Sequence, residues 1–510
     1  MVRSEAMVMA LTVSIVAATA ALWQWQGRKE RWRERVQRIL RKFTRESATP
    51  APLLWQVADA LASNMEASLS ISGNQKEDGG GGGGGGSSSS LNMLVAFVDS
   101  LPTGEEEGIY YGVNLRSKDF LILSARLAGN KSPISDLHRQ EVAFPSHVLQ
   151  SSSSQEVFDF VASKVAEFVA AHPVETGVGK GLGFTVSYPM GHSATEFDSS
   201  SSSTNTAIKW KSFLVDDPVQ DQKQLLGEIN SALKKHGMDV QAFTLATDPA
   251  GDLAGGRYYS RDCVAAVTLG VGTSVAYTEP AESVPRSRWL GLVTMGWGNF
   301  NCPDFPVTEI DSCLDSESSN PGHQIFEKLI SGTYLGEIVR RVLLKMARGA
   351  SLFGNRVLPP GLKTPYVLSI NDVATMHQDT SEDREAVADK LRSIFKIADT
   401  TLTTREIVAE VCDVAVERGA RLAAAGIVGI IKKLKRIEDK KSMVTVEGEL
   451  YESYRVFRNY LLSGVWEMLG KELSDNVVVE CSHGGPGSGT VFLAATHQGA
   501  TAASGVIDAE

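Results

Sequence analysis

Hydrophobic and polar positions alternate along the chain with two different periods. Apolar residues at every second position, or in short continuous runs, predict strands at residues 109–115, 120–127, 182–189, 241–248, 263–269 and 476–480. Helical spacing of apolar residues predicts helices at residues 53–69, 157–171, 222–236, 325–347 and 404–434. This alternation is typical of an α/β protein, and a length of 510 residues leaves room for two lobes.

The N-terminal pattern is different from the rest of the chain. Residues 6–26 are uncharged and mostly apolar, which is long enough to span a bilayer. Trp23 and Trp25 lie at the end of this segment, where an aromatic belt would meet the membrane surface. Residues 28–45 follow with nine basic and two acidic residues, and such a flank keeps its side of a span in the cytoplasm. Residues 1–27 are therefore predicted to be a membrane anchor.

Two alternatives for this region stay open. Ala18-Thr19-Ala20 has the pattern of a signal-peptide cleavage site, but the preceding residues carry no net positive charge and the mature chain would start with a basic stretch. The basic stretch could bind nucleic acid, although attraction to anionic lipid beside a membrane span is the simpler explanation. No nucleic-acid partner is predicted.

Composition adds three facts. The net charge of −10 combines about +7 from residues 28–45 with −17 (−10 − 7) from the remainder, so the two regions suit different surroundings. Eight of the 47 glycines form the run 79–86, which continues into serines 87–90 as a flexible insertion. The chain is thus expected to comprise the anchor, a basic and insertion-bearing segment at 28–90, a small lobe at 91–247 and a large lobe at 248–500. Five cysteines without a CxxC pair predict neither a disulfide framework nor a zinc module, and fit a reducing compartment.

Several long and specific sequence blocks resemble the plant hexokinase family from about residue 53 to about residue 498. These blocks are LGFTVSYP (182–189), LAGGRYY (253–259), WGNF (297–300), NPG (320–322), QIFEK (324–328), YLGE (334–337) and RGARLAAAG (418–426). The resemblance implies an actin-like ATPase (ribonuclease H-like) fold in which two lobes close over a hexose and Mg-ATP. It also implies transfer of the γ-phosphoryl group to the hexose 6-hydroxyl. Anchored members lie on the mitochondrial outer membrane facing the cytosol, and this location is expected here.

The catalytic base of the family has a counterpart in this chain. The family block LVNDTVGTLA reads LATDPAGDLA at residues 245–254, and its aspartate aligns with Asp248. A carboxylate there would accept the proton of the attacking hydroxyl. Thr247 replaces an asparagine that binds sugar in the family. Pro249 replaces a threonine, and proline removes an amide donor beside the base.

The sugar-binding positions have mostly changed. A family glutamate in NMEWGNF is replaced by Gly296 and a glutamate in NPGEQ by His323, while Ser274 stands where the family has asparagine. The WTKGF block is shortened around Lys211, and only Ser187 is unchanged. Loss of charged hydrogen bonds, each worth about 1.5–3 kcal/mol, is expected to weaken sugar binding. The positions carried over as sugar-binding are Ser187, Lys211, Thr247, Ser274, Thr294, Gly296 and His323.

The ATP-binding positions have changed as well. The family turn DLGGTNFRV reads NLRSKDFLI at residues 114–122, so side chains replace the glycines that admit a phosphate to the backbone. Arg116 and Lys118 could bind an anion themselves, or they could simply be a solvated hairpin tip. Glu417 replaces a threonine and would repel a triphosphate. The positions carried over as ATP-binding are Arg116, Ser117, Lys118, Gly272, Thr273, Glu417, Gly485, Gly487 and Gly489. The histidines form no metal-binding pair at helical spacing, and no metal site is predicted.

These substitutions lead to a functional prediction. A kept scaffold with altered ligand positions predicts a membrane-anchored hexokinase-like protein with weak or absent catalysis and a regulatory or sugar-signalling role. The alternative is an active hexokinase with altered sugar preference that uses Asp248 as its base. A third possibility is a sugar-binding sensor without turnover. Mg-ATP and hexose are the ligands that the family resemblance implies.

Overall fold

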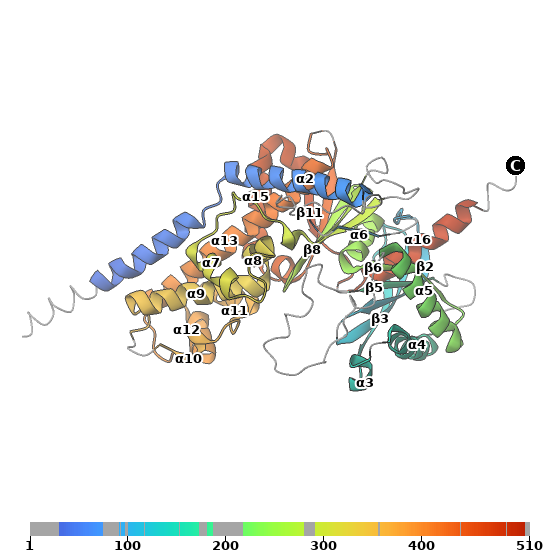
Figure 1. Cartoon of the computed structure of the whole chain (residues 1–510), viewed down its shortest axis with the longest axis horizontal. Helices are drawn as coiled ribbons and strands as arrows, with labels where there is room; N and C mark the ends of the chain where they lie inside the picture. The colour runs from blue at the N-terminus through green and yellow to red at the C-terminus, as the bar shows by residue number, and fades with distance from the viewer. Residues whose placement is uncertain are drawn as a thin grey trace, which may run out of the picture. The chain divides into compact units, whose positions relative to one another are not determined.

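The computed structural model describes most of the chain (Figure 1). The chain divides into two compact units. The described residues are 30–74, 91, 93–96, 100–116, 118–151, 153–172, 181–186, 218–279, 291–354, 358–438, 440–485 and 487–504. Unit 1 comprises Met1–Ala48, Pro306–Leu314 and Tyr334–Arg418, and unit 2 comprises Thr49–Phe305, Asp315–Thr333 and Gly419–Glu510.

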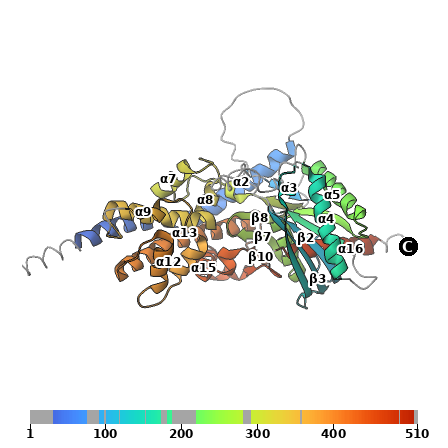
Figure 2. The ribbon, with the colours of Figure 1, turned by 90° about the horizontal axis from the view of Figure 1, so that it is seen from below.

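Unit 2 contains a five-stranded sheet that begins with the predicted hairpin. Its strands are β2 (Glu107–Leu115), β3 (Asp119–Ala128), β4 (Ser135–Ala143), β5 (Gly181–Val186) and β6 (Gln241–Thr247), in the order β4-β3-β2-β5-β6. Strands β2, β3 and β4 are antiparallel neighbours, whereas β5 and β6 run parallel to β2. Helices α4 (Ser154–Ala171) and α5 (Pro218–Lys235) pack together against this sheet, and their apolar residues share its core (Figure 2).

A second, six-stranded sheet in unit 2 repeats this arrangement. Its strands are β7 (Cys263–Leu269), β8 (Thr273–Glu279), β9 (Gly291–Met295), β10 (Ser442–Glu447) and β11 (Val477–Cys481), with β1 (Met93–Ala96) added at one edge. The order β9-β8-β7-β10-β11 matches β4-β3-β2-β5-β6, with the same change from antiparallel to parallel pairing. The predicted α/β class is confirmed, and the duplicated sheet is that of an actin-like fold.

Two helices that pack on each other position the ends of the central strands. Helix α6 (Asp248–Tyr259) follows β6, and helix α16 (Gly489–Ser504) packs on α6, β2 and β5. A Cβ atom on Gly489 would collide with the backbone of Gly251, so this close approach requires glycine. Pro249 lies in the first turn of α6, where its missing N–H costs no helical hydrogen bond.

The remaining helices of unit 2 surround the two sheets. They are α2 (Ala51–Asn74), α3 (Ser146–Leu149), α8 (Ile325–Ile330), α14 (Glu449–Glu452), α15 (Arg455–Leu473) and the short 3₁₀ turns η3 (Trp297–Asn299) and η4 (Ser474–Asn476). The predicted helices at 53–69 and 404–434 are confirmed by α2 and by α13 (Leu402–Lys433), whose first half belongs to unit 1.

The single helix predicted at 325–347 is wrong, because the chain forms two helices there. Helix α8 ends at Ile330, Ser331 is extended (φ −80°, ψ 154°), and α9 (Gly332–Ala350) begins directly after it. The Gly332 N–H donates to the Gly270 carbonyl at 2.8 Å instead of to a carbonyl one turn earlier in a helix. The hydrophobic pattern continues through this break, and for that reason the pattern did not reveal it.

Unit 1 is helical in the residues that the structure describes. A helix over residues 30–46 accompanies α7 (Glu309–Glu317), α9, α10 (Pro360–Lys363), α11 (Ile370–His377), α12 (Glu385–Phe395) and the first half of α13. Among the described helices, none combines the length and the apolar character that a membrane crossing requires. The predicted anchor at residues 6–26 lies outside the described residues.

Candidate functional site

The predicted base Asp248 lies where three parallel strands of the first sheet end. Asp248 directly follows β6 and is half-buried. Asn114, near the end of β2, donates from Nδ2 to Asp248 Oδ1 at 2.6 Å and to Thr185 Oγ1 of β5 at 2.8 Å. Carboxyl ends of parallel strands share one edge of a sheet, and ligands of open α/β sheets bind at such edges. Asn114 therefore connects the predicted base to the turn that would hold phosphate.

Arg116 occupies the hairpin turn that follows Asn114. Its Nε atom lies 3.1 Å from Asn114 Oδ1, and its Nη1 atom lies 2.7 Å from Glu141 Oε1 and 3.3 Å from Asp119 Oδ1. The guanidinium group is thus shared between two carboxylates on the neighbouring strands. Lys118 lies beside it in the same turn, and the adjoining Ser117 lies outside the described residues.

A polar cavity opens around these residues within unit 2. It has about 410 Å³ of empty space, counted to its open mouth. Its lining residues are Asn114, Arg116, Thr185, Asp248, Asp252, Glu447, Gly487, Gly489 and Thr490. The structure therefore brings together Asp248, Arg116, Gly487 and Gly489 from the predicted sites. It adds Asn114, Asp252 and Glu447, to which the sequence analysis gave no role.

Three carboxyl groups face this one cavity, and they interact. Burial, followed by the nearby negative charges of Glu447 and Asp248, raises the pKa of Asp252 well above its ordinary value. Burial and the charge of Asp248 raise the pKa of Glu447 to about 7. The carboxyl groups of Asp252 and Glu447 are close enough to share one proton, which favours the protonated form of Asp252. Glu447 ends strand β10, much as Asp248 directly follows strand β6. An acidic residue at a strand end is the signal that could have identified it.

A second set of predicted residues meets beside the second sheet. Thr247 Oγ1 lies 2.8 Å from Thr294 Oγ1, so two positions predicted to bind sugar touch across β6 and β9. Gly296 is buried and directly precedes η3. Ser274 pairs with Thr268 in the β7–β8 ladder.

Glu327 is an acidic group of this region that the sequence analysis did not single out. Its Oε1 atom accepts a hydrogen bond from the Thr273 N–H at 3.1 Å, and its Oε2 atom contacts the Thr273 hydroxyl. A Cβ atom on Gly298 would come within 2.6 Å of Glu327 Oε2, so the chain wraps closely around this carboxyl. Burial raises the pKa of Glu327 to about 7, although the hydrogen bonds from Thr273 act in the opposite direction. The signal was an acidic residue inside the apolar QIFEK block.

Other predicted positions lie apart from these two sets. His323 is exposed in the turn before α8, whereas Glu327 one helical turn later is buried. Gly485 has a positive φ of 74° and lies beside the Arg139 guanidinium, which donates to the Gly484 carbonyl. Glu417 is half-buried in the part of α13 that belongs to unit 1. Ser187 and Lys211 lie outside the described residues.

The cavity residues do not suit a triphosphate. Three carboxyl groups line the cavity, and Arg116, the one cation among the described residues of its lining, already contacts Asp119 and Glu141. Burial and the charge of Asp248 already keep protons on Asp252 and Glu447, and a triphosphate would add negative charge to the same site. Within the described ranges, no group of three His, Cys, Asp or Glu side chains is arranged to hold a metal ion. We therefore derive no step of catalysis through Mg-ATP at this cavity.

Comparison with known proteins covers nearly the whole chain. A family model described as hexokinase matches residues 39–258, and a second with the same description matches residues 264–496. Hexokinase-1 of Spinacia oleracea is 40% identical over 505 residues, covering 95% of this chain and 96% of the relative. Hexokinase-2 of Oryza sativa subsp. japonica is 40% identical over 485 residues, covering 92% of each chain.

Solved structures show the same fold. A hexokinase crystal structure has a TM-score of 0.73 at 21% identity, covering 91% of this chain and 100% of its own. Schistosoma mansoni hexokinase complexed with glucose has a TM-score of 0.68 at 25% identity, covering 90% and 99% respectively. At 40% identity over almost its full length, the chain belongs to the hexokinase family.

Proposed function

We propose that this chain is a hexokinase-family protein with weak or no hexose phosphorylation, and that its main role is regulatory or in sugar signalling. The observation that carries the proposal is the hydrogen bond from Asn114 Nδ2 to Asp248 Oδ1 at 2.6 Å. A general base needs a free lone pair directed at the hydroxyl proton that it accepts. Here a neighbouring amide occupies one oxygen of the group that the family uses as base.

The electrostatics of the cavity support the same proposal. Phosphoryl transfer depends on positive charge and backbone donors around the phosphates. This cavity is instead lined by the carboxyl groups of Asp248, Asp252 and Glu447. The guanidinium group of Arg116 is shared with Asp119 and Glu141. We expect Mg-ATP to bind weakly for this reason.

The second candidate is an active hexokinase with altered sugar preference. Asp248 is present at the end of β6, and Thr247, Thr294 and the buried Glu327 offer polar groups on the same unit. In that case Asp248 would accept the proton of the hexose 6-hydroxyl. The hydroxyl oxygen would bond to the γ-phosphorus while the bond between the γ-phosphorus and ADP breaks.

An activity assay separates the two candidates. The full chain in neutral detergent is given Mg-ATP with glucose, fructose or mannose in a coupled assay, beside spinach hexokinase-1 under the same conditions. We expect kcat/KM to be at least about 100-fold below that of the relative, the order of loss seen when one group that acts in the transition state is removed. Turnover within tenfold of the relative, abolished by Asp248→Ala, would contradict the proposal.

Asn114→Leu tests the observation that carries the proposal. The substitution removes the amide donor from Asp248 while keeping nearly the same shape and adding no charge to the cavity, and we expect it to raise kcat/KM about tenfold. Asn371→Leu, at an exposed asparagine on α11 of unit 1, is the matched control and should change nothing. Calorimetry with millimolar hexose then distinguishes a sugar sensor, which binds without turnover, from a protein that no longer binds sugar.

We also propose that residues 6–26 anchor the chain in the mitochondrial outer membrane with its body facing the cytosol. The uncharged segment and its basic flank support this proposal. A regulatory role would then be exercised at that membrane surface.

A further inference from the structure

The helix over residues 30–46 has two faces of opposite character. Its apolar side chains Val36, Leu40 and Phe43 are buried within unit 1. Basic side chains at spacings of four and three residues share the other face and are exposed: Arg31, Arg35, Arg38, Lys42 and Arg45. Because protein already covers the apolar face, this helix is not available to lie in a bilayer as an amphipathic membrane helix does. Its basic face stays on the outside.

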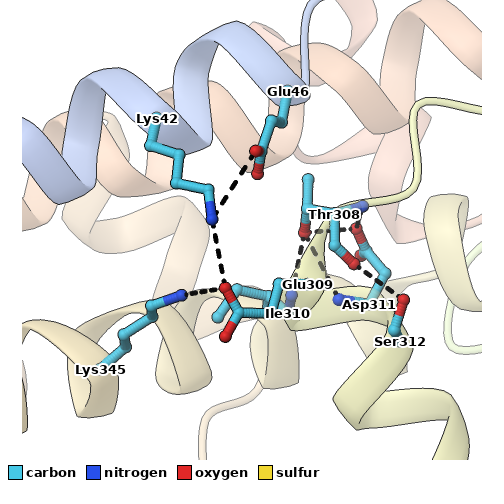
Figure 3. Close-up of polar contacts among 8 residues, drawn as sticks. All are labelled: Lys42, Glu46, Thr308, Glu309, Ile310, Asp311, Ser312 and Lys345. Atoms are coloured by element: carbon cyan, nitrogen blue, oxygen red, sulfur yellow. Dashed lines mark hydrogen bonds and ion pairs between the residues drawn. The ribbon is translucent and has the colours of Figure 1, made fainter.

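Specific contacts hold the helix to the rest of unit 1. Lys42 Nζ lies 3.3 Å from Glu309 Oε2 of α7, and Lys345 Nζ of α9 lies 2.6 Å from the same oxygen (Figure 3). The Trp32 indole donates to the Ser351 carbonyl at 3.3 Å. Hydrogen bonds from Lys345 and Lys42 lower the pKa of Glu309, so its carboxylate stays charged between two ammonium groups.

A groove lies beside these contacts, between the helix, the start of α7 and α9. It has about 580 Å³ of empty space, counted to its open mouth. Its apolar wall is formed by Ile39, Phe43, Ile310 and Val342. Ile39 is half-buried, whereas Ile310, Phe43 and Val342 are 9%, 4% and 0% exposed. The apolar surface that faces solvent in the groove therefore lies at Ile39 and at the edges of Ile310 and Phe43, and it favours an apolar occupant.

The rim of the groove carries an excess of positive charge. The cations are Arg38, Lys42 and Lys345, against the two carboxylates Glu46 and Glu309. Lys42 pairs with both carboxylates and Lys345 pairs with Glu309, so the excess is one positive charge. The flanking basic face of the helix adds further positive charge outside the groove. An occupant with an apolar body and an anionic end would satisfy both the wall and the rim.

We propose that this groove binds one anionic phospholipid, with the phosphate on Arg38, Lys42 and Lys345 and the first part of an acyl chain against Ile39 and the edges of Phe43 and Ile310. An inorganic anion would leave the apolar wall uncovered, and a neutral apolar ligand would leave the cationic rim unused. The helix begins four residues after the end of the predicted span at 6–26, which would place the groove near the lipid headgroups. In this respect the proposal rests on the proposed membrane attachment.

Binding of short-chain lipids to the detergent-solubilised full chain tests the proposal independently of the anchor. The probes are dioctanoyl phosphatidic acid, dioctanoyl phosphatidylcholine and glycerol 3-phosphate, followed by calorimetry. We expect the phosphatidic acid to bind at least tenfold more tightly than the phosphatidylcholine and at least 100-fold more tightly than glycerol 3-phosphate. Equal affinity for the two lipids would overturn the role of the rim, and equal affinity for glycerol 3-phosphate would overturn the role of the wall.

Two variants with the same loss of charge distinguish a discrete site from diffuse attraction. Arg38→Gln/Lys345→Gln removes two rim cations, whereas Arg35→Gln/Arg348→Gln removes two exposed cations of the same two helices outside the groove. We expect the first to lose at least ten times more affinity for phosphatidic acid than the second. Equal losses would show diffuse attraction and overturn the proposal. If the double variant loses its fold, Arg38→Gln and Arg35→Gln, both at exposed positions, make the same comparison.

These outcomes are separate from those of the anchor. A chain that fails to bind phosphatidic acid in detergent but fractionates with membranes would contradict the groove and leave the anchor standing. A chain that binds the lipid in detergent but fractionates as soluble protein would contradict the anchor and leave the groove standing.

Discussion

At the residue scale, the acidic groups of unit 2 differ in what surrounds them. Glu327 is 6% exposed, and the hydrogen bonds from Thr273 only partly offset the burial of its charge. Asp248 instead accepts a hydrogen bond from Asn114 at the edge of an open cavity. Burial is therefore the main influence on the Glu327 carboxyl group, whereas a hydrogen-bond donor contacts the Asp248 carboxyl group.

Glu327 makes the stability of the fold depend on pH. Its pKa is about 7 in the folded chain against 4.5 ordinarily, so the folded state keeps a proton that the unfolded chain releases as pH rises through 4.5. Stability should therefore fall between pH about 4.5 and about 7, by about 3 kcal/mol at 1.36 kcal/mol per pKa unit. The Glu327→Gln variant should lose most of this dependence of stability on pH. Unfolding temperatures of both proteins at pH 5 and pH 8 measure the difference.

The control for Glu327 is an exposed acid. Glu472→Gln, on α15, should leave the pH dependence of the wild type unchanged. A Glu327→Gln chain whose unfolding temperature falls with pH as steeply as that of the wild type would show that other groups cause the decline.

At the element scale, one buried ion pair joins α7 to α13 within unit 1. The Arg418 guanidinium contacts both oxygens of Asp311, at 2.7 Å and 2.8 Å, and also donates to the Pro306 carbonyl at 3.1 Å. Burial alone would raise the pKa of Asp311, but the charge and hydrogen bonds of Arg418 and those of Thr308 outweigh it and lower the pKa. The RGARLAAAG block therefore has a structural task at its first residue.

Removing one partner of this pair should be strongly destabilising. Asp311→Ala leaves the Arg418 charge buried without a counter-ion, and we expect a cost of about 3–5 kcal/mol in the free energy of unfolding. Asp389→Ala breaks an exposed Asp–Arg pair on α12 and should cost at most about 1 kcal/mol. The double variant Asp311→Ala/Arg418→Met should be more stable than Asp311→Ala alone, and urea unfolding that ranks it below the single variant would refute this view.

Several elements were predicted from the local pattern alone, although β4, β8, β10, α12 and α15 were not predicted. The hairpin of β2 and β3 and the helices α2, α4, α5 and α13 lie where alternation or helical spacing placed them. The break between α8 and α9 was not predicted, because it depends on the Gly332 N–H donating to Gly270, 62 residues earlier in the chain. No window of the local pattern contains both ends of that bond.

At the scale of the whole molecule, the charge distribution separates the N-terminal region from the body. Residues 28–45 carry about +7 and the remainder about −17, so the body would be repelled by an anionic membrane surface that attracts the basic stretch. This arrangement suits a body held near the membrane by its N-terminus.

Deletion of residues 6–26 tests the anchor directly. In leaf cells the full chain should fractionate with a mitochondrial outer-membrane marker and resist a carbonate wash, because a spanning helix is inserted and not merely adsorbed. The deletion variant should move to the soluble fraction. Persistent, salt-sensitive membrane association of the deletion variant would mean that the basic stretch alone is sufficient, and a soluble full chain would contradict the anchor.

The sequence by itself determined the family, the α/β class and the position of Asp248 at the end of a strand, because each depends on a contiguous block or a local period. Only the tertiary structure decided what surrounds these residues. Asn114 lies 134 residues from the carboxylate that it contacts, and Lys42 lies 267 residues from Glu309. Periodicity reports which side of an element is apolar, whereas a hydrogen bond or a groove depends on which elements meet. For that reason only the folded structure shows the hydrogen bond from Asn114 to Asp248 and the groove with its cationic rim.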